Sequence, residues 1–199
     1  KKVLKVLNGQ TLFPPPIWLM RQAGRYLPEY RKLRSKASSF LDLCYNSNLA
    51  SEVTLQPIKR FDFDAAIIFA DILLICQAMG QSLEFKEGVG PILDPVKDKY
   101  DLNKLSISIT DTKLENVFQT ILKTRKKLAS SKTLIGFAGS PWTVVVYMIE
   151  GKSGTKFDTI KKISVKNPSF IDSLIELVVE VTSIYLKKQI QAGVDVIQL

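Results

Sequence analysis

Short apolar segments alternate along the chain with longer amphipathic ones, and this alternation restricts the fold more than any other feature. The strand candidates are residues 16–20, 64–69, 133–137 and 194–199. The segment 64–69 is almost continuously apolar, which is typical of a strand that is covered on both faces. Strands separated by helices predict a parallel sheet with crossover connections, and both a doubly wound sheet and a TIM barrel fit this pattern.

Helices are expected where apolar residues recur at helical spacing. Residues 114–128 and 168–192 show this spacing most clearly, and a further helix is expected over residues 47–58. Asn167 is a candidate N-cap for the second of these helices, with Pro168 at its first position and Gly193 at its end. The glycine-rich stretch 83–91 predicts a small hairpin.

The last strand candidate, residues 194–199, coincides with the end of the sequence. A buried strand needs neighbours on both edges and cover on both faces. We therefore expect residues 1–199 to form a single incomplete (β/α) barrel domain, truncated after the strand 194–199. About four parallel strands would make half of a TIM (β/α)8 barrel. The sequence leaves open whether this is a fragment or the ordered part of a longer protein.

The absence of histidine limits the chemistry that these 199 residues can perform. A histidine-based triad, an HExxH zinc site and a histidine general base are all excluded from this segment. Carboxylates, arginine, tyrosine and backbone groups remain. The two cysteines, Cys44 and Cys76, show no metal or redox spacing and are expected to be free thiols in a reducing cytosol.

The formal net charge of +9 raises the question of an anionic partner. Most of the excess is lysine dispersed along the chain, and the densest basic run, residues 123–127, is predicted to be the solvated face of a helix. A diffuse positive field also suits an anionic small molecule. No apolar run approaches the ~20 residues of a membrane span. We expect a cytoplasmic protein that binds neither nucleic acid nor membrane.

Two arginines follow the first strand candidate. Parallel α/β folds bind their ligands at the carboxyl ends of their strands, and the arginines come at such an end. Arg21 and Arg25 flank Gln22 and Gly24, and a guanidinium forms two charge-assisted hydrogen bonds with a carboxylate. Gly24 would allow the backbone to approach a ligand closely. The alternative interpretation is that both arginines pair with acidic residues such as Glu29.

Asp71 and Tyr147 are two further candidates near strand ends. Asp71 comes just after the segment 64–69 and is either a helix N-cap or an acidic group at the mouth of a barrel. Tyr147 lies about two turns into a helix that Pro141 opens. Its hydroxyl would face either a pocket or water.

These stretches together resemble one family. Residues 16–31 and 136–151 closely resemble the two signature regions of uroporphyrinogen decarboxylases, and residues 61–80 around Asp71 are similar to the same family. The resemblance extends over essentially the whole chain. It implies a homodimeric TIM-barrel enzyme of haem biosynthesis that needs no metal or organic cofactor. Such an enzyme converts uroporphyrinogen III to coproporphyrinogen III by removing CO2 from four acetate arms.

The resemblance also implies roles for individual residues. Arg21 and Arg25 would hold or protonate substrate carboxyl and pyrrole groups, and Asp71 would face the four pyrrole N–H groups. Tyr147 would lie close to Asp71 and to the reacting arm. The implied substrate-binding residues are Arg21, Gln22, Ala23, Arg25, Asp71 and Tyr147.

The chemistry is consistent with these residue types. Protonation of a pyrrole carbon creates a cation that accepts the electrons released with CO2, and a buried carboxylate such as Asp71 would stabilise it. Arginines would orient the substrate carboxylates. Because arginine is effectively always protonated, the identity of the proton donor stays open.

The family continues beyond the strand 194–199 into a serine-bearing loop and a histidine that contacts substrate, so residues 1–199 alone are expected to be inactive.

Three alternatives remain open. Cobamide-linked methyltransferases of the same superfamily bind zinc, but the intact Arg21–Arg25 stretch argues against them. A non-enzymatic anion or nucleic-acid binder would show strongly salt-dependent binding. A dinucleotide-dependent oxidoreductase is disfavoured because no Gly-x-Gly-x-x-Gly follows a strand.

Overall fold

The computed structural model describes residues 1–109 and 112–199. These residues divide into two compact units, of which the first comprises Lys1–Asp71, Glu115–Ala138 and Leu186–Leu199. The second comprises Ile72–Leu114 and Gly139–Tyr185. Each unit contains its own buried side chains and its own strands.

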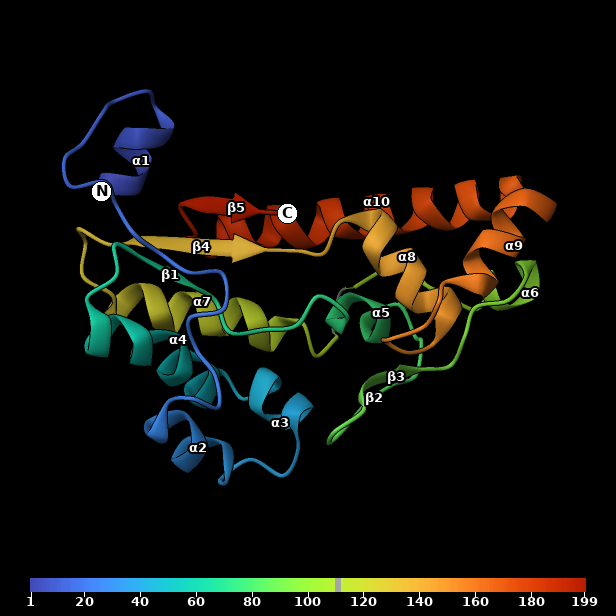
Figure 1. Cartoon of the computed structure of the whole chain (residues 1–199), viewed down its shortest axis with the longest axis horizontal. Coiled ribbons are helices and arrows are strands. Elements are labelled where there is room, and N and C mark those ends of the chain that lie inside the picture. The colour runs from blue at the N-terminus through green and yellow to red at the C-terminus, as the bar shows by residue number, and fades with distance from the viewer. Residues whose placement is uncertain (110–111) are drawn as a thin grey trace. The chain divides into compact units, whose positions relative to one another are not determined.

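A parallel sheet lies at the centre of the first unit (Figure 1). Its strands are β1 (Ala65–Ile67), β4 (Thr133–Phe137) and β5 (Val196–Gln198), in the order β1-β4-β5. In this register Ala66 faces Leu134, and Gly136 faces Ile197. The prediction of an α/β fold with parallel strands is thus confirmed, with each strand shorter than its apolar segment.

The strand expected at residues 16–20 is wrong, because this segment is irregular. Ile17 ties the segment to the rest of the unit, because its N–H donates to the Asp64 carboxylate at 2.9 Å. The Ile17 carbonyl accepts from Asp64 N–H, also at 2.9 Å. The three prolines that precede Ile17 have no N–H to donate, so the segment cannot extend a ladder toward its N-terminal side.

The helices of the first unit pack against this sheet and against one another. They are α1 (Lys2–Leu7), α2 (Pro28–Arg34), α3 (Phe40–Tyr45), α4 (Ser47–Phe61) and α7 (Glu115–Lys127). α4 begins at Asn46, whose side-chain oxygen accepts the N–H groups of Asn48 and Leu49, both at 3.2 Å. The helices expected over 47–58 and 114–128 are confirmed.

The basic run 123–127 is only partly the solvated face that its composition predicts. Thr124 is fully buried, and its hydroxyl donates to the Ser51 hydroxyl at 3.1 Å. Lys123 donates to the hydroxyl of Ser47 at 2.8 Å and to Asn48 at 2.7 Å. The run therefore lies at the contact between α4 and α7, and its last two lysines are the exposed ones.

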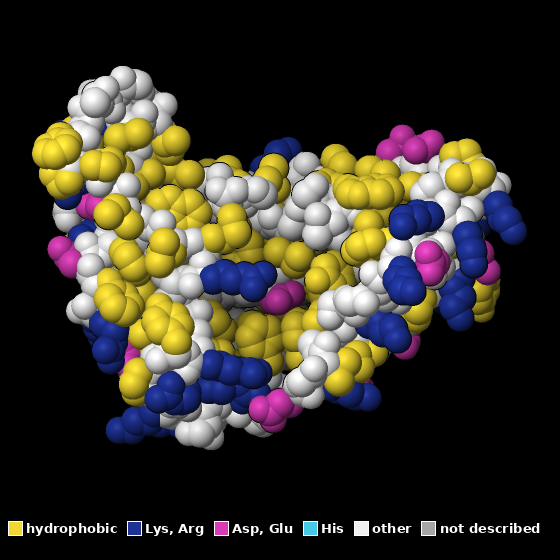
Figure 2. Space-filling model, viewed as in Figure 1, with side chains coloured by type: hydrophobic (Ala, Val, Ile, Leu, Met, Phe, Trp, Pro, Cys, Tyr) yellow, Lys and Arg dark blue, Asp and Glu magenta, His cyan; other side chains and the backbone are white. Residues whose placement is uncertain are grey.

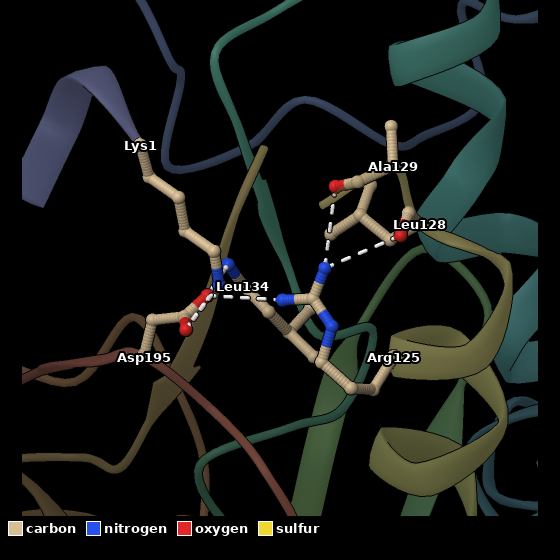
Figure 3. Close-up of polar contacts among 6 residues, drawn as sticks. All are labelled: Lys1, Arg125, Leu128, Ala129, Leu134 and Asp195. Carbon is tan, nitrogen blue, oxygen red and sulfur yellow. Dashed lines mark hydrogen bonds and ion pairs between the residues drawn. The ribbon is translucent and has the colours of Figure 1, made fainter. Parts of the chain in front are cut away.

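A carboxylate immediately before β5 connects three separate segments of the first unit (Figure 3). Asp195 accepts hydrogen bonds from the Lys1 ammonium, from Arg125 at 3.0 Å and from the Leu134 backbone N–H at 2.8 Å. In return, Asp195 N–H donates to the Leu134 carbonyl at 2.8 Å. These contacts extend the pairing of β4 with β5 by one residue at its N-terminal end.

The side chain of Gln189 holds the other end of β4. Gln189 lies near the end of α10 (Pro168–Gln191). Its amide nitrogen donates to the Phe137 carbonyl at 2.9 Å, and its oxygen accepts Phe137 N–H at 3.0 Å. A β-carbon at Gly136 would collide with Gln189 and would lie 3.1 Å from Val194 and Ile197. Glycine at position 136 is therefore what permits this close approach.

The second unit contains the predicted hairpin and a set of helices. Its elements are α5 (Leu74–Ala78), β2 (Leu83–Lys86), β3 (Gly90–Leu93), α6 (Lys99–Leu102), α8 (Pro141–Glu150), α9 (Asp158–Lys166) and the first part of α10. β2 and β3 pair antiparallel. Leu93 N–H donates to the Gly151 carbonyl at 2.7 Å, which ties the hairpin to the end of α8. Gly151 has φ +74, and a β-carbon there would lie 2.9 Å from the Leu93 carbonyl oxygen.

We predict that Asp195→Asn lowers the free energy of unfolding by about 2 kcal/mol, because two cations lose their charged partner in a partly buried site. Chemical denaturation followed by circular dichroism would measure this loss. Glu52→Gln, at an exposed position of α4, is the control and should stay within about 0.5 kcal/mol of the unchanged protein. Equal effects of the two substitutions would contradict a structural role for Asp195.

Candidate functional site

The loop before α2 carries four of the expected site residues, and a buried glutamine fixes its position. Gln22 is only 1% exposed. Its side-chain nitrogen donates to the Ala65 carbonyl at 3.2 Å, and its oxygen accepts Leu19 N–H at 3.3 Å. Since Ala65 is the first residue of β1, this contact anchors the loop to the sheet. The Gln22 side chain is therefore engaged within the protein, and Ala23 packs against the neighbouring apolar cluster.

Further bonds hold the backbone of this loop while its two arginines extend from it. The Tyr26 hydroxyl donates to the Gln22 carbonyl, and Arg31 donates to the Arg25 carbonyl at 2.7 Å. Arg21 and Arg25 are both exposed. A loop with a fixed backbone and exposed guanidinium groups is suited to binding carboxylates.

The pairing of Arg21 and Arg25 with Glu29 is wrong. Glu29 instead binds Arg60 with two hydrogen bonds of 2.8 Å. The hydrogen bond from Arg60 lowers the pKa of the Glu29 carboxyl below its usual value. Within residues 1–109 and 112–199, neither Arg21 nor Arg25 forms an ion pair. Both charges are available to an anionic ligand.

Asp71 is half-buried and lies four residues beyond the end of β1. The N-cap position of the following helix, α5, is occupied by Leu73. Asp71 therefore does not occupy the N-cap position that was the alternative interpretation. It lies where the chain leaves the carboxyl end of a parallel strand, the edge at which α/β folds bind ligands.

The charges of Asp71 and of Arg25 act on two buried side chains, Cys44 and Tyr30. Burial raises the pKa of the Cys44 thiol well above its usual value, and the negative charge of Asp71 raises it further. Burial also raises the pKa of Tyr30, while the positive charges of Arg34 and Arg25 oppose this. Arg25 and Asp71 thus each act on a buried side chain of the first unit.

Tyr147 belongs to the second unit and lines a pocket between α8 and α9. The pocket has a volume of about 510 Å³. Its lining residues are Trp142, Thr143, Val146, Tyr147, Lys152, Ser153, Gly154, Phe157, Ile160 and Lys161. The Tyr147 hydroxyl was expected to face either a pocket or water. Tyr147 is one of the residues that line this pocket. Its approach to Asp71 stays a prediction.

The pocket combines apolar walls with positive charge. Trp142 and Phe157 are about half exposed, at 50% and 47%. Lys152 and Lys161 supply two cations, and no acidic residue is among the lining residues. Figure 2 shows Lys and Arg side chains gathered over α9, and a second group over α2 in the first unit. The pocket therefore suits a ligand that is both apolar and anionic.

A side-chain hydrogen bond and a backbone bridge hold the walls of this pocket together. The Glu150 carboxylate accepts Ile160 N–H at 2.9 Å, which joins the end of α8 to the first turn of α9. Lys152 pairs with Ile92 of β3 in an isolated bridge. The sequence did not single out Lys152 or Lys161, since they are two lysines among many. The signal that would have found them is their spacing around a glycine-rich turn between two helices.

Among the described residues, no group of three or more His, Cys, Asp or Glu side chains is arranged to hold a metal ion. No helix in the described part of the chain is long and apolar enough to cross a bilayer.

The family model for uroporphyrinogen decarboxylase (URO-D) matches residues 1–199. The chain belongs to the uroporphyrinogen decarboxylase family. It is 50% identical over 199 residues to the uroporphyrinogen decarboxylase of Agrobacterium fabrum (strain C58 / ATCC 33970), covering 100% of this chain and 58% of that protein. The corresponding protein of Chelativorans sp. (strain BNC1) is 47% identical with the same coverage. The chain thus spans just over half the length of these relatives.

A solved structure supports the fold of this decarboxylase-family chain. A methyltransferase from Methanosarcina mazei superposes with a TM-score of 0.78 and 18% sequence identity. The match covers 98% of this chain and 56% of the methyltransferase. At this identity the likeness concerns the fold alone.

The raised pKa of Cys44 predicts how stability depends on pH. In the unfolded chain the thiol ionises near its ordinary value of 9.0, whereas in the folded protein it stays protonated to higher pH. Its contribution to stability is therefore present below that value and is lost as the pH rises, by at most about 1.4 kcal/mol per pH unit. We expect the difference in unfolding free energy between the unchanged protein and Cys44→Ala to stay constant below pH 9.0 and to shrink as the pH rises above it. A difference that is constant or grows above that pH would contradict this.

Proposed function

We propose that the complete protein which contains these residues is a uroporphyrinogen decarboxylase, a carboxy-lyase of haem and porphyrin biosynthesis. The observation that carries this proposal is the family match over all 199 residues, with relatives of that name at 47–50% identity. The substrate would be uroporphyrinogen III and the product coproporphyrinogen III.

The first unit would bind the macrocycle through opposite charges. Exposed Arg21 and Arg25 would bind carboxylate arms, each through a planar fork of donors. The Gln22 side chain would act by holding the loop on β1, and Ala23 by packing beneath it, so their contacts with substrate would come from the backbone. Asp71 would accept the pyrrole N–H groups at the centre of the ring.

The reaction would proceed by protonation and loss of CO2 at one arm at a time. A proton adds to a pyrrole carbon and leaves a positive charge on the ring. The bond between the acetate methylene and its carboxylate then breaks, CO2 leaves, and the electron pair neutralises the ring. A second proton converts the methylene to a methyl group, and loss of the ring proton restores the pyrrole. Asp71 would stabilise each cationic stage by its fixed negative charge.

The strand order agrees with the barrel that the family implies. In a barrel each strand pairs with the next parallel strand along the chain, and one half of a doubly wound sheet has the same order, so the family match decides for the barrel. The observed order β1-β4-β5 follows the chain without reversal. We infer that residues 1–199 belong to one TIM (β/α)8 barrel domain, of which they form a part, since the chain spans 58% of the length of its relatives. A homodimer of the complete protein and a cytoplasmic location stay predictions.

A cobamide-linked methyltransferase is the second candidate, but the likeness to a solved methyltransferase concerns the fold alone and does not favour this function. Relatives named as decarboxylases at 47–50% identity weigh against it, because the methyltransferase likeness has only 18% identity. Zinc analysis of the complete protein separates the two. Stoichiometric zinc without decarboxylation would favour the methyltransferase.

We predict that Asp71→Asn in the complete protein lowers kcat for coproporphyrinogen formation by about 100-fold or more, because a neutral amide cannot stabilise the ring cation. Chromatographic analysis of the porphyrins formed after oxidation would measure the rate. Exposed Glu52→Gln is the matched control for charge removal and should leave kcat unchanged. A fully active Asp71→Asn variant would remove Asp71 from the mechanism.

The pocket of the second unit gives a separate prediction. We expect the double substitution Lys152→Ala and Lys161→Ala to raise KM for uroporphyrinogen about tenfold with little change in kcat, since these two lysines line an apolar pocket that suits an anionic ligand. Lys162→Ala, an exposed neighbour on α9 outside the pocket, is the control. If control and double variant have the same KM, the pocket does not bind the substrate arms.

A further inference from the structure

We propose that Thr54 is a positioning residue for Asp71, acting through a hydrogen bond to the backbone of Phe69. This inference rests on the proposed function, because it assigns the cause of the placement of Asp71 in that site. The residues involved all belong to the first unit.

The buried hydroxyl of Thr54 makes two hydrogen bonds in opposite senses. Thr54 lies in α4 and is 1% exposed. Its hydroxyl donates to the Ala50 carbonyl at 2.8 Å and accepts Phe69 N–H at 3.0 Å. The proton and one lone pair of a single hydroxyl are thus both used, so the bond to Phe69 has a defined direction.

The bond to Phe69 occurs where the chain leaves the sheet. Ile68 N–H still donates to the Ile135 carbonyl of β4, at 3.0 Å. At the next residue the partner is no longer a strand but the side chain of Thr54. A backbone N–H that is partly withdrawn from water requires a partner, and here α4 supplies the one that the sheet no longer provides.

The side chain of Phe69 is held as firmly as its backbone. Its ring packs against Tyr30, with centroids 5.9 Å apart at 60°, and against Phe40, with centroids 5.9 Å apart at 72°. Such tilted and edge-on contacts are favourable arrangements of aromatic rings. Residue 69 is therefore anchored from α4, from α2 and from α3.

Asp71 follows Phe69 after a single residue, so its Cα lies within about 8 Å of the anchored Cα of Phe69. A displacement of about 1 Å at a reacting group can reduce the rate about 100-fold. Loss of the Thr54 hydroxyl would release the Phe69 N–H and let the backbone that carries Asp71 shift. Thr54 would not touch the substrate, so its effect should appear in kcat rather than in KM.

Three variants of the complete protein test this inference. Thr54→Val keeps the shape but removes the hydroxyl, and Thr54→Ser restores the hydroxyl. Thr120→Val in α7 is the matched control, because Thr120 is also fully buried and its hydroxyl donates to a carbonyl four residues back, that of Asn116, at 2.8 Å. The control therefore loses the same kind of bond within a helix without releasing the backbone near Asp71.

We expect Thr54→Val to lower kcat about tenfold or more, with KM changed less than about threefold. Thr54→Ser and Thr120→Val should keep kcat within about threefold of the unchanged protein. Thr54→Val should lose more stability than Thr120→Val in chemical denaturation, because it also leaves the Phe69 N–H without its partner. Hydrogen exchange of the Phe69 amide should accelerate in Thr54→Val and not in Thr120→Val.

Several outcomes would overturn the inference. These are an unchanged kcat in folded Thr54→Val, an equal loss of kcat in Thr120→Val, or no rescue in Thr54→Ser. If Thr54→Val does not fold, Phe69→Leu replaces it, since it removes the contacts with Tyr30 and Phe40. An unchanged kcat in that variant would also overturn the inference. Failure of the proposed function would appear differently, as absence of decarboxylation by the unchanged protein.

Discussion

The first unit depends on one carboxylate that three distant parts of the chain share. Asp195 accepts hydrogen bonds from Lys1 at the beginning of the chain, from Arg125 at the end of α7 and from the backbone of Leu134 in β4 (Figure 3). A partly buried carboxylate requires such partners, because desolvation without compensation costs several kcal/mol. The bonds fix where β4 and β5 begin to pair, and the strand register follows from that point.

Neutral side chains hold the two segments of this unit that carry the charged residues of the proposed site. The loop before α2 is held by the neutral side chain of Gln22, and the end of β1 by the neutral hydroxyl of Thr54. Neither anchor occupies a charged group of the proposed site. Arg21 and Arg25 are exposed, and Glu29 forms its ion pair with Arg60 instead. The arrangement keeps cations available where an acidic substrate would bind.

The sequence alone determined the fold class and the family. The apolar segments around residues 64–69, 133–137 and 194–199 became parallel strands, because a strand covered on both faces must be apolar along its length. The site candidates were found because their residue types follow strand ends and match the family motifs. The expected strand at residues 16–20 failed, since apolar content predicts burial but does not show which backbone groups find a partner.

Only the tertiary structure decided how those residues are held and which charges are paired. The partner of Glu29, Arg60, is 31 residues away. The hydroxyl that binds Phe69 N–H belongs to Thr54 of α4, 15 residues earlier in the chain. The basic run 123–127 looked solvated by composition, yet the packing of α7 on α4 buries its threonine and engages Lys123. Local patterns record hydrophobicity and charge along the chain. Hydrogen-bond partners depend on which segments meet in space, and only the folded chain determines that.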